Sequence, residues 1–217
     1  LSSLPCELTN HVHMVGAVGE EADKFTRQGQ ADWESILLNR ARELRPGGRA
    51  VLVNFCRDEA GRYLGNTGGV NMFDTFNDIW LSFLAEGKIS REEYSRMTLP
   101  QYYRTVDEFT APLTDPTSPC HQAGLRLESI ETGIVPCPFA KQFKLDGDVQ
   151  KFADGLIPTV RSWNQSIFTA GLDASRAPEE KTALIESYYG AYHQKVLDDP
   201  TGHGMDYVHA YMTLSKV

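Results

Sequence analysis

Several features that mark other classes of protein are scarce in this sequence. None of the apolar runs approaches the roughly 20 residues needed to cross a bilayer. Lys and Arg total 21 against 29 Asp and Glu, which gives a net charge of -8, and no basic block interrupts this acidity. A surface that tracks phosphates needs clustered positive charge. We therefore expect neither a membrane nor a nucleic acid as a partner.

Metal-binding and disulfide patterns are also missing. The four cysteines are widely scattered and form no CxxC pair: Cys6, Cys56, Cys120 and Cys137. This spacing indicates neither a zinc site nor a disulfide framework, and reduced thiols fit a cytoplasmic protein. The pair His11 and His13 could supply two metal ligands, but a metal needs a third convergent ligand, and none stands nearby. We expect both histidines to lie on the surface or to pack in a loop.

What the sequence does contain is organised around a helix, a glycine turn and an apolar strand. Helical spacing of apolar residues predicts a helix over 21–44, and Pro46-Gly47-Gly48 ends it. A buried strand follows from Ala50 to Phe55. Because Val51, Leu52 and Val53 are consecutive and point to both sides, we expect this strand to be covered on both faces and to have parallel neighbours. With 41% hydrophobic residues, the 217-residue chain can bury a sizeable core.

The rest of the sequence alternates strands with groups of helices. Capping boxes at Ser90 and Thr105 begin two short helices, and Pro158 predicts a kink or break in a longer helix that starts near Val149. The expected order is the end of an α/β core over 1–66, a helical insert over 67–124, a core strand within 125–138, a second helical insert over 139–204 and a last strand within 205–217. Helices inserted beyond the strand ends would form a lid over a small molecule.

A glycine-rich loop follows the first predicted strand at Gly65-Asn66-Thr67-Gly68-Gly69. A phosphate-binding loop would carry a lysine and would follow directly on a strand, and this loop does neither. A flexible loop without a phosphate is the better interpretation.

Four phrases of the sequence, in their order, resemble one enzyme family. They are LSSLPCEL, LRPGGRAVLVNF, FLAEGKISREEYSRMTLPQYYRTVDEF and YVHAYMTLSKV. Together they resemble the plant-type (SABATH-like) carboxyl methyltransferases, which methylate small acids with S-adenosylmethionine. The resemblance implies an α/β fold, namely the carboxyl-terminal part of a Rossmann-like methyltransferase sheet with a largely helical substrate cap. It also implies that the segments that hold the cofactor in this family come earlier than Leu1, so we assign no cofactor contact.

The resemblance also implies a substrate pocket for an aromatic or aliphatic acid. Matching the family's motifs places six residues on pocket positions: Met72, Phe73, Tyr102, Val160, Trp163 and Tyr207. Their large side chains could equally belong to an ordinary core, and this alternative stays open.

Neither a metal site nor a catalytic dyad is expected. Some family members have a magnesium-binding Asp-x-Phe-Asn where this chain has Ser95-Arg96-Met97-Thr98. A carboxylate is already ionised at neutral pH and needs no general base, and neither His193 nor His209 has a recognisable partner in the sequence. The competing hypotheses are an N-methyltransferase of the same family and a non-catalytic ligand-binding or dimerisation module. An uncovered sheet would favour a homodimer or association with the missing amino-terminal part.

Overall fold

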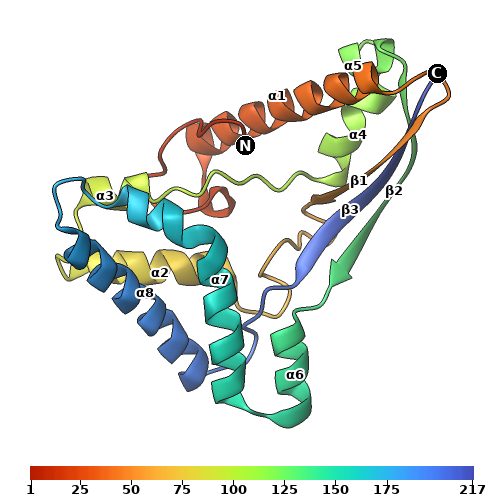
Figure 1. Ribbon diagram of the computed structural model, residues 1–217. Helices are drawn as coiled ribbons and strands as arrows, with labels where there is room; N and C mark the ends of the chain where they lie inside the picture. The colour runs from red at the N-terminus through yellow and green to blue at the C-terminus, as the bar shows by residue number, and fades with distance from the viewer.

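The computed structural model describes residues 1–217 and divides them into a sheet part and a helical cap (Figure 1). The sheet part holds strands β1 (Arg49–Phe55), β2 (Leu125–Val135) and β3 (Tyr207–Lys216). Helices α1 (Gly19–Glu43), α4 (Val106–Thr114) and α5 (Pro119–Gln122) accompany it, after a short 3-10 helix at Met14–Gly16. No helix combines the length and the apolar character needed to span a membrane.

The three strands form one antiparallel sheet in the order β1-β3-β2. The last strand of the chain lies in the middle, where Met212 stands opposite Leu52 of β1 and Ile130 of β2. Our expectation of parallel neighbours for β1 is wrong, because its partner β3 runs antiparallel to it. The pairing of β2 with β3 has one irregularity, a shift of register between Leu127 and Ser129.

One face of the sheet is covered by helices and the other is open. Alternate residues of β3 are buried against α1, α4 and α5: Val208, Ala210, Met212 and Leu214. On β1 the opposite face is exposed, with 71% of Val51, 52% of Val53 and 41% of Phe55 accessible. The run of apolar residues does point to both faces, as expected from the pleat, but the second face is not covered by any element of this chain.

The cap consists of α2 (Met72–Ala85), α3 (Arg91–Arg96), α6 (Pro138–Asp146), α7 (Val149–Gly171) and α8 (Pro178–Asp198). Its core is rich in aromatic rings, and Trp80 stacks on Tyr188 with ring centroids 4.3 Å apart. Of the kink or break predicted at Pro158, the break does not occur, since α7 continues through the proline. Figure 1 shows that the helix changes direction along its length. Burial of Leu156, Ile157 and Val160 on either side of the proline offsets a cost of about 3 kcal/mol.

Packing divides the first predicted insert, 67–124, between the two parts of the molecule. Helices α2 and α3 belong to the cap, whereas α4 and α5 pack with α1 against the sheet. The indole N–H of Trp33 donates to the carbonyl oxygen of Phe109 at 3.0 Å, and the two rings meet edge to face at 5.0 Å. The capping box at Thr105 is present and begins α4 as predicted, and the one at Ser90 likewise begins α3.

The junction between α1 and the segment before α4 depends on one glycine. A Cβ atom at Gly29 would lie 2.7 Å from the ring of Tyr102. We expect Gly29→Ala to lower the free energy of unfolding by about 1–2 kcal/mol, because overpacking outweighs the better helix propensity of alanine. The matched control is Gly190→Ala in α8, where nothing lies within 4 Å of the new atom. There the change is expected to stabilise by about 0.5–1 kcal/mol. Urea unfolding of both variants measures the two changes in the free energy of unfolding, which should have opposite signs. Changes of the same sign would contradict the packing argument.

Candidate functional site

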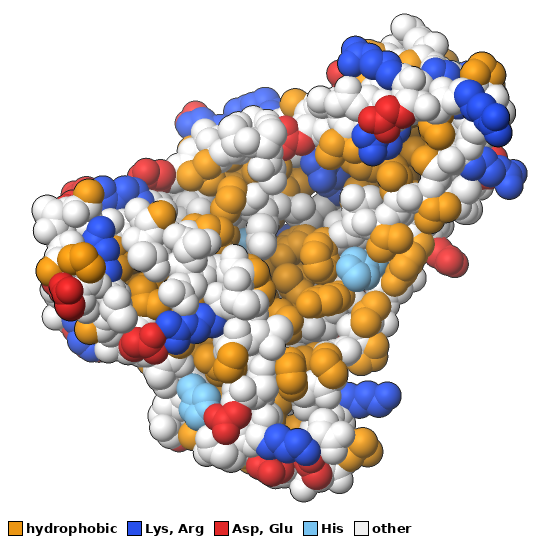
Figure 2. All heavy atoms as spheres, viewed as in Figure 1, with side chains coloured by type: hydrophobic (Ala, Val, Ile, Leu, Met, Phe, Trp, Pro, Cys, Tyr) orange, Lys and Arg blue, Asp and Glu red, His pale blue; other side chains and the backbone are white.

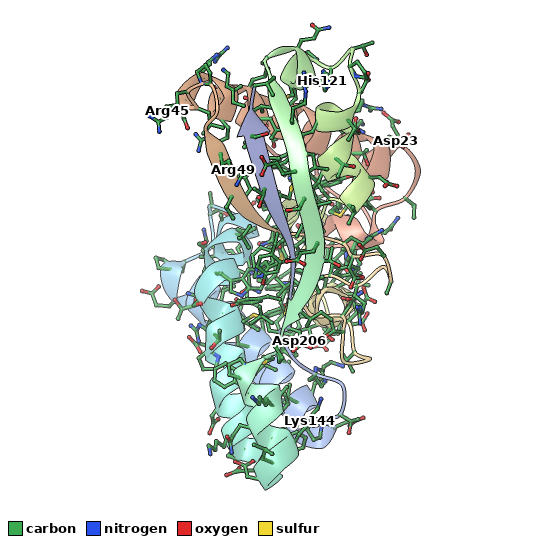
Figure 3. All side chains as sticks on the ribbon, turned by 90° about the vertical axis from the view of Figure 1, so that its right-hand side faces the viewer. Asp23, Arg45, Arg49, His121, Lys144 and Asp206 are labelled. Carbon is green, nitrogen blue, oxygen red and sulfur yellow. The ribbon has the colours of Figure 1, made fainter.

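A mainly apolar cavity of about 290 Å³ lies where the carboxyl end of β1, the start of β3 and helix α7 meet. Its walls are formed by six residues: Phe55, Leu64, Gln101, Trp163, Met205 and Tyr207. Figure 2 shows apolar atoms gathered in the hollow between the cap and the sheet. In Figure 3 the same end of the sheet is marked by Asp206, which precedes β3, while Arg49 marks the far end of β1. The volume is close to the lower end of the range for small-molecule pockets, about 300 Å³.

Contacts between aromatic rings, most of them edge to face, fix the walls of this cavity. The rings of Phe55 and Tyr207 lie 5.3 Å apart at 90°, which is a consequence of their positions at the adjoining ends of β1 and β3. Trp163 is supported from behind by Phe76 at 6.0 Å and Phe73 at 6.5 Å. Rings held in this way lose little further freedom when a flat ligand binds between them.

Gln101 supplies the polar group of the cavity wall. Its side-chain oxygen accepts a hydrogen bond of 3.3 Å from the hydroxyl of Tyr103, which is itself buried. The amide N–H₂ of Gln101 donates to no group of the chain. The cavity can therefore offer a neutral donor to an oxygen atom of a ligand.

His13 lies behind Gln101 and is completely buried. Its ring stacks on Phe73 at a centroid distance of 3.8 Å, and its Nδ1 accepts from the backbone N–H of Val15 at 3.2 Å. Burial, and then the neighbouring His11, lower the pKa of His13 well below its usual value. Because Nδ1 of the neutral ring accepts from Val15, the proton lies on Nε2, and a hydrogen bond with the side chain of Gln101 opposes the lowering of the pKa. The loop-packing interpretation of this pair is confirmed, since His11 is also buried.

The structure brings some of the six predicted pocket residues together and separates others. Trp163 and Tyr207 line the cavity. Phe73 lies one layer behind it, in contact with Trp163. Met72 packs beneath Gly65, and Val160 is buried in the core of the cap. A role for any of these residues in substrate binding remains a prediction.

Tyr102 is the predicted pocket residue that lies farthest from this arrangement. Its hydroxyl donates to Glu108 and contacts Thr26, so the ring faces α1 instead of the cavity. The physical reason is the extended backbone of this segment, in which successive side chains point to opposite sides. Gln101 and Tyr103 face the cavity side, and Tyr102 between them faces away.

Four cavity residues were missed by the sequence analysis: Phe55, Leu64, Gln101 and Met205. Phe55 carried a usable signal, because it ends the central strand at the place where ligands bind in α/β folds. Gln101 is the middle residue of the Pro-Gln-Tyr phrase, but the sequence does not reveal which of its side chains turns inward. For Leu64 and Met205, which lie in loops, the sequence carries no such signal.

The remaining ionisable groups form no catalytic dyad at the cavity. His193 does have a partner, contrary to our expectation, since its Nε2 lies 2.8 Å from a carboxylate oxygen of Asp154 on the surface of the cap. His209 lies on the open face of the sheet, 4.8 Å from the ring of Phe55, and its Nδ1 has no partner. The structure contains no group of three or more His, Cys, Asp or Glu side chains that could hold a metal ion.

Comparison with known families decides what this fold is. A family model described as SAM dependent carboxyl methyltransferase matches residues 3–118, which is more than half of the 217-residue chain. The chain belongs to this family. The resemblance inferred from the four sequence phrases is thereby confirmed.

This carboxyl methyltransferase chain spans only part of the length of two similar proteins. The indole-3-acetate O-methyltransferase 1 of Oryza sativa subsp. japonica is 30% identical over 110 residues, which are 50% of this chain and 27% of that protein. A solved structure of loganic acid methyltransferase with SAH superposes with a TM-score of 0.68 at 20% identity. This match covers the whole chain and 58% of the solved one. At this identity the match establishes the fold, which is the α/β methyltransferase fold that we expected.

The carboxyl methyltransferase family uses S-adenosylmethionine, and the cavity can be tested against that cofactor. A nucleoside with a ribose and a sulfonium calls for carboxylate or several amide partners, but none of the six lining residues is acidic. Asp58, the first carboxylate after β1, is occupied by Arg62 and by the backbone N–H of Ala60. The cavity therefore does not fit the cofactor, whereas its five apolar walls suit an apolar group.

Proposed function

We propose that the gene product transfers the methyl group of S-adenosylmethionine to the carboxylate of a small-molecule acid. In this proposal, the chain supplies the pocket that holds the rest of the acid. The observation that carries the proposal is a mainly apolar cavity with one amide, in a chain of the carboxyl methyltransferase family. Both similar proteins are named for carboxylic acids, indole-3-acetate and loganic acid. We further propose that residues outside these 217 hold the cofactor.

The chemistry asks little of the pocket beyond orientation and dryness. The bound cofactor supplies an electrophilic methyl group, and the acid is ionised at neutral pH without a base. Good orientation can contribute about 7–11 kcal/mol to the barrier reduction. Phe55, Trp163 and Tyr207 would fix the plane of the acid, and the five apolar walls would keep water from the nucleophile.

The proposal is tested by supplying the gene product, in the form that its cell makes, with labelled S-adenosylmethionine and a panel of aromatic and aliphatic acids. Label recovered as methyl esters supports it. Label recovered on amine nitrogen would favour the alternative N-methyltransferase, and acid binding without transfer would favour a non-catalytic binding module. Intact mass spectrometry of the same material determines whether residues beyond these 217 accompany the pocket.

The polar group of the cavity gives a sharper prediction. We expect Gln101→Met to raise the KM about fivefold for acids that carry a neutral oxygen substituent on the body, because one neutral hydrogen bond of about 1 kcal/mol is lost. Acids with a purely apolar body should keep their KM, since methionine preserves the volume. Steady-state kinetics on one such matched pair of acids checks this. An equal change for both acids would mean that Gln101 shapes the cavity without recognising the substituent.

A further inference from the structure

A column of stacked rings runs beside the cavity and ends in an arginine. The rings of Phe73 and His13 lie 3.8 Å apart, those of His13 and Tyr103 5.4 Å, and those of Tyr103 and Tyr63 5.7 Å. The guanidinium carbon of Arg57 lies 5.3 Å from the centre of the Tyr63 ring. We call these five residues the aromatic column. A planar guanidinium over the face of an aromatic ring is held in orientation by that contact.

Arg57 has no counter-ion within this chain. Its side chain takes part in none of the ion pairs or hydrogen bonds of the structure, and its Nε is buried without a partner. The neighbouring acids are occupied elsewhere. Asp58 binds Arg62 at 2.8 Å, and Glu59 accepts from the hydroxyl of Thr132 at 2.8 Å.

An uncompensated, partly buried charge is costly, and native folds retain such groups mainly where something else uses them. The other polar ring of the aromatic column, that of His13, is fully buried and has the side chain of Gln101 as its hydrogen-bonding neighbour. Arg57 is therefore the cationic donor of the column that lacks a partner. It indicates an acceptor of negative charge that the chain itself does not supply.

Arg57 follows closely on the end of β1. Phe55 is the last residue of the strand, and the buried Cys56 separates it from Arg57. The backbone of Arg57 is anchored there, since its N–H donates to the carbonyl oxygen of Arg104 at 2.8 Å. Phe55 lines the cavity and lies 6.3 Å from Tyr103 of the column. Arg57 thus stands just beyond the carboxyl end of β1, where α/β folds bind their ligands.

We infer that Arg57 binds the carboxylate of the acid whose body occupies the cavity. The inference rests on the proposed function and adds to it the residue that selects an ionised acid over a neutral analogue. The guanidinium can hold the carboxylate oxygen that does not take the methyl group, which leaves the other oxygen free. No acidic side chain needs to be displaced for this contact.

The test compares three variants of the gene product. Arg57→Met keeps an apolar stem over Tyr63 and removes the charge, and Arg57→Lys keeps the charge without the planar fork. The control is Arg49→Met at the other end of β1, where the exposed arginine pairs with Glu128. We expect Arg57→Met to raise the KM for the acid at least tenfold, within the range for a hydrogen bond to a charged group. Arg57→Lys should recover part of this loss, and Arg49→Met should change nothing.

Two further readouts separate a ligand contact from a structural role. Binding of the acid and of its uncharged amide is measured by titration calorimetry. Arg57→Met should weaken the binding of the acid and leave the binding of the amide unchanged. The thermal midpoint of Arg57→Met should be maintained or raised, because an unpaired charge has been removed. Any of three results would overturn the inference. They are a lower thermal midpoint with an unchanged KM for the acid, a loss of affinity confined to S-adenosylmethionine, and equal losses of affinity for the acid and its amide. Wild-type protein that neither methylates nor binds any acid would instead refute the proposed function.

Discussion

Replacing Trp163 by alanine is expected to raise the KM for the acid about 70-fold. An aromatic side chain offers about 150–250 Å² of surface. If roughly 100 Å² of this faces the ligand, about 2.5 kcal/mol of apolar contact is lost at ~25 cal/mol per Å². Trp163 contributes one wall of the cavity, and the walls from the sheet, Phe55 and Tyr207, cannot move to replace it because they are fixed by strand pairing. Steady-state kinetics with saturating cofactor measures the effect.

The matched control for this variant is Ile167→Ala. Ile167 lies one helical turn further along α7 and packs partly buried against the same core of the cap, but it does not line the cavity. Both variants should lose some stability, whereas the large rise in KM belongs to Trp163→Ala. If Ile167→Ala raised the KM to a similar extent, the effect would come from a loosened cap and the assignment of Trp163 to the pocket would be wrong.

Local structure could be predicted from the sequence because its causes are local. The capping boxes at Ser90 and Thr105, the glycine turn after α1 and the alternation of β3 each depend on a few neighbouring residues. The partner of β1 could not be predicted in this way. Its apolar run is equally compatible with parallel neighbours, and only the approach of β3, more than 150 residues later by the sequence numbering, decides the pairing.

The site was predicted in part for the same reason. Trp163 and Tyr207 could be placed by matching motifs, because a helix face and a strand end keep their orientation among relatives. The Pro-Gln-Tyr-Tyr segment is extended and irregular, so a shift of one residue exchanges inward for outward side chains. This accounts for the prediction of Tyr102 where the structure turns Gln101 and Tyr103 towards the cavity. The unsatisfied Arg57 has no signature in a sequence, since the absence of a counter-ion is a property of the fold.

Replacing Glu93 by alanine is expected to lower the free energy of unfolding by about 3 kcal/mol, because it removes one partner of a buried charge pair. The side chain of Glu93 is 2% exposed and accepts two hydrogen bonds from Arg176, at 2.5 and 2.8 Å, together with one from the backbone N–H of Asp173 at 2.7 Å. These bonds attach α3 to the connection between α7 and α8. Urea unfolding measures the loss. The control is Glu186→Ala, which removes an exposed pair with Arg161 and should cost less than about 1 kcal/mol.

The same carboxylate predicts how stability depends on pH. Hydrogen bonds from Arg176, and then from the backbone N–H groups of Asp173 and Ser90, lower the pKa of Glu93 from 4.5 to about 2. A group whose pKa is lower in the folded state stabilises the fold fully above its unfolded pKa and loses this contribution as the pH falls towards its folded pKa. The stability difference between wild type and Glu93→Gln should therefore be complete at neutral pH and should shrink between about pH 4.5 and pH 2. Urea unfolding of both proteins at pH 7 and at pH 3 compares the two differences. Equal differences at both pH values would mean that the Glu93 carboxylate, as a charge, does not hold α3 to the rest of the cap.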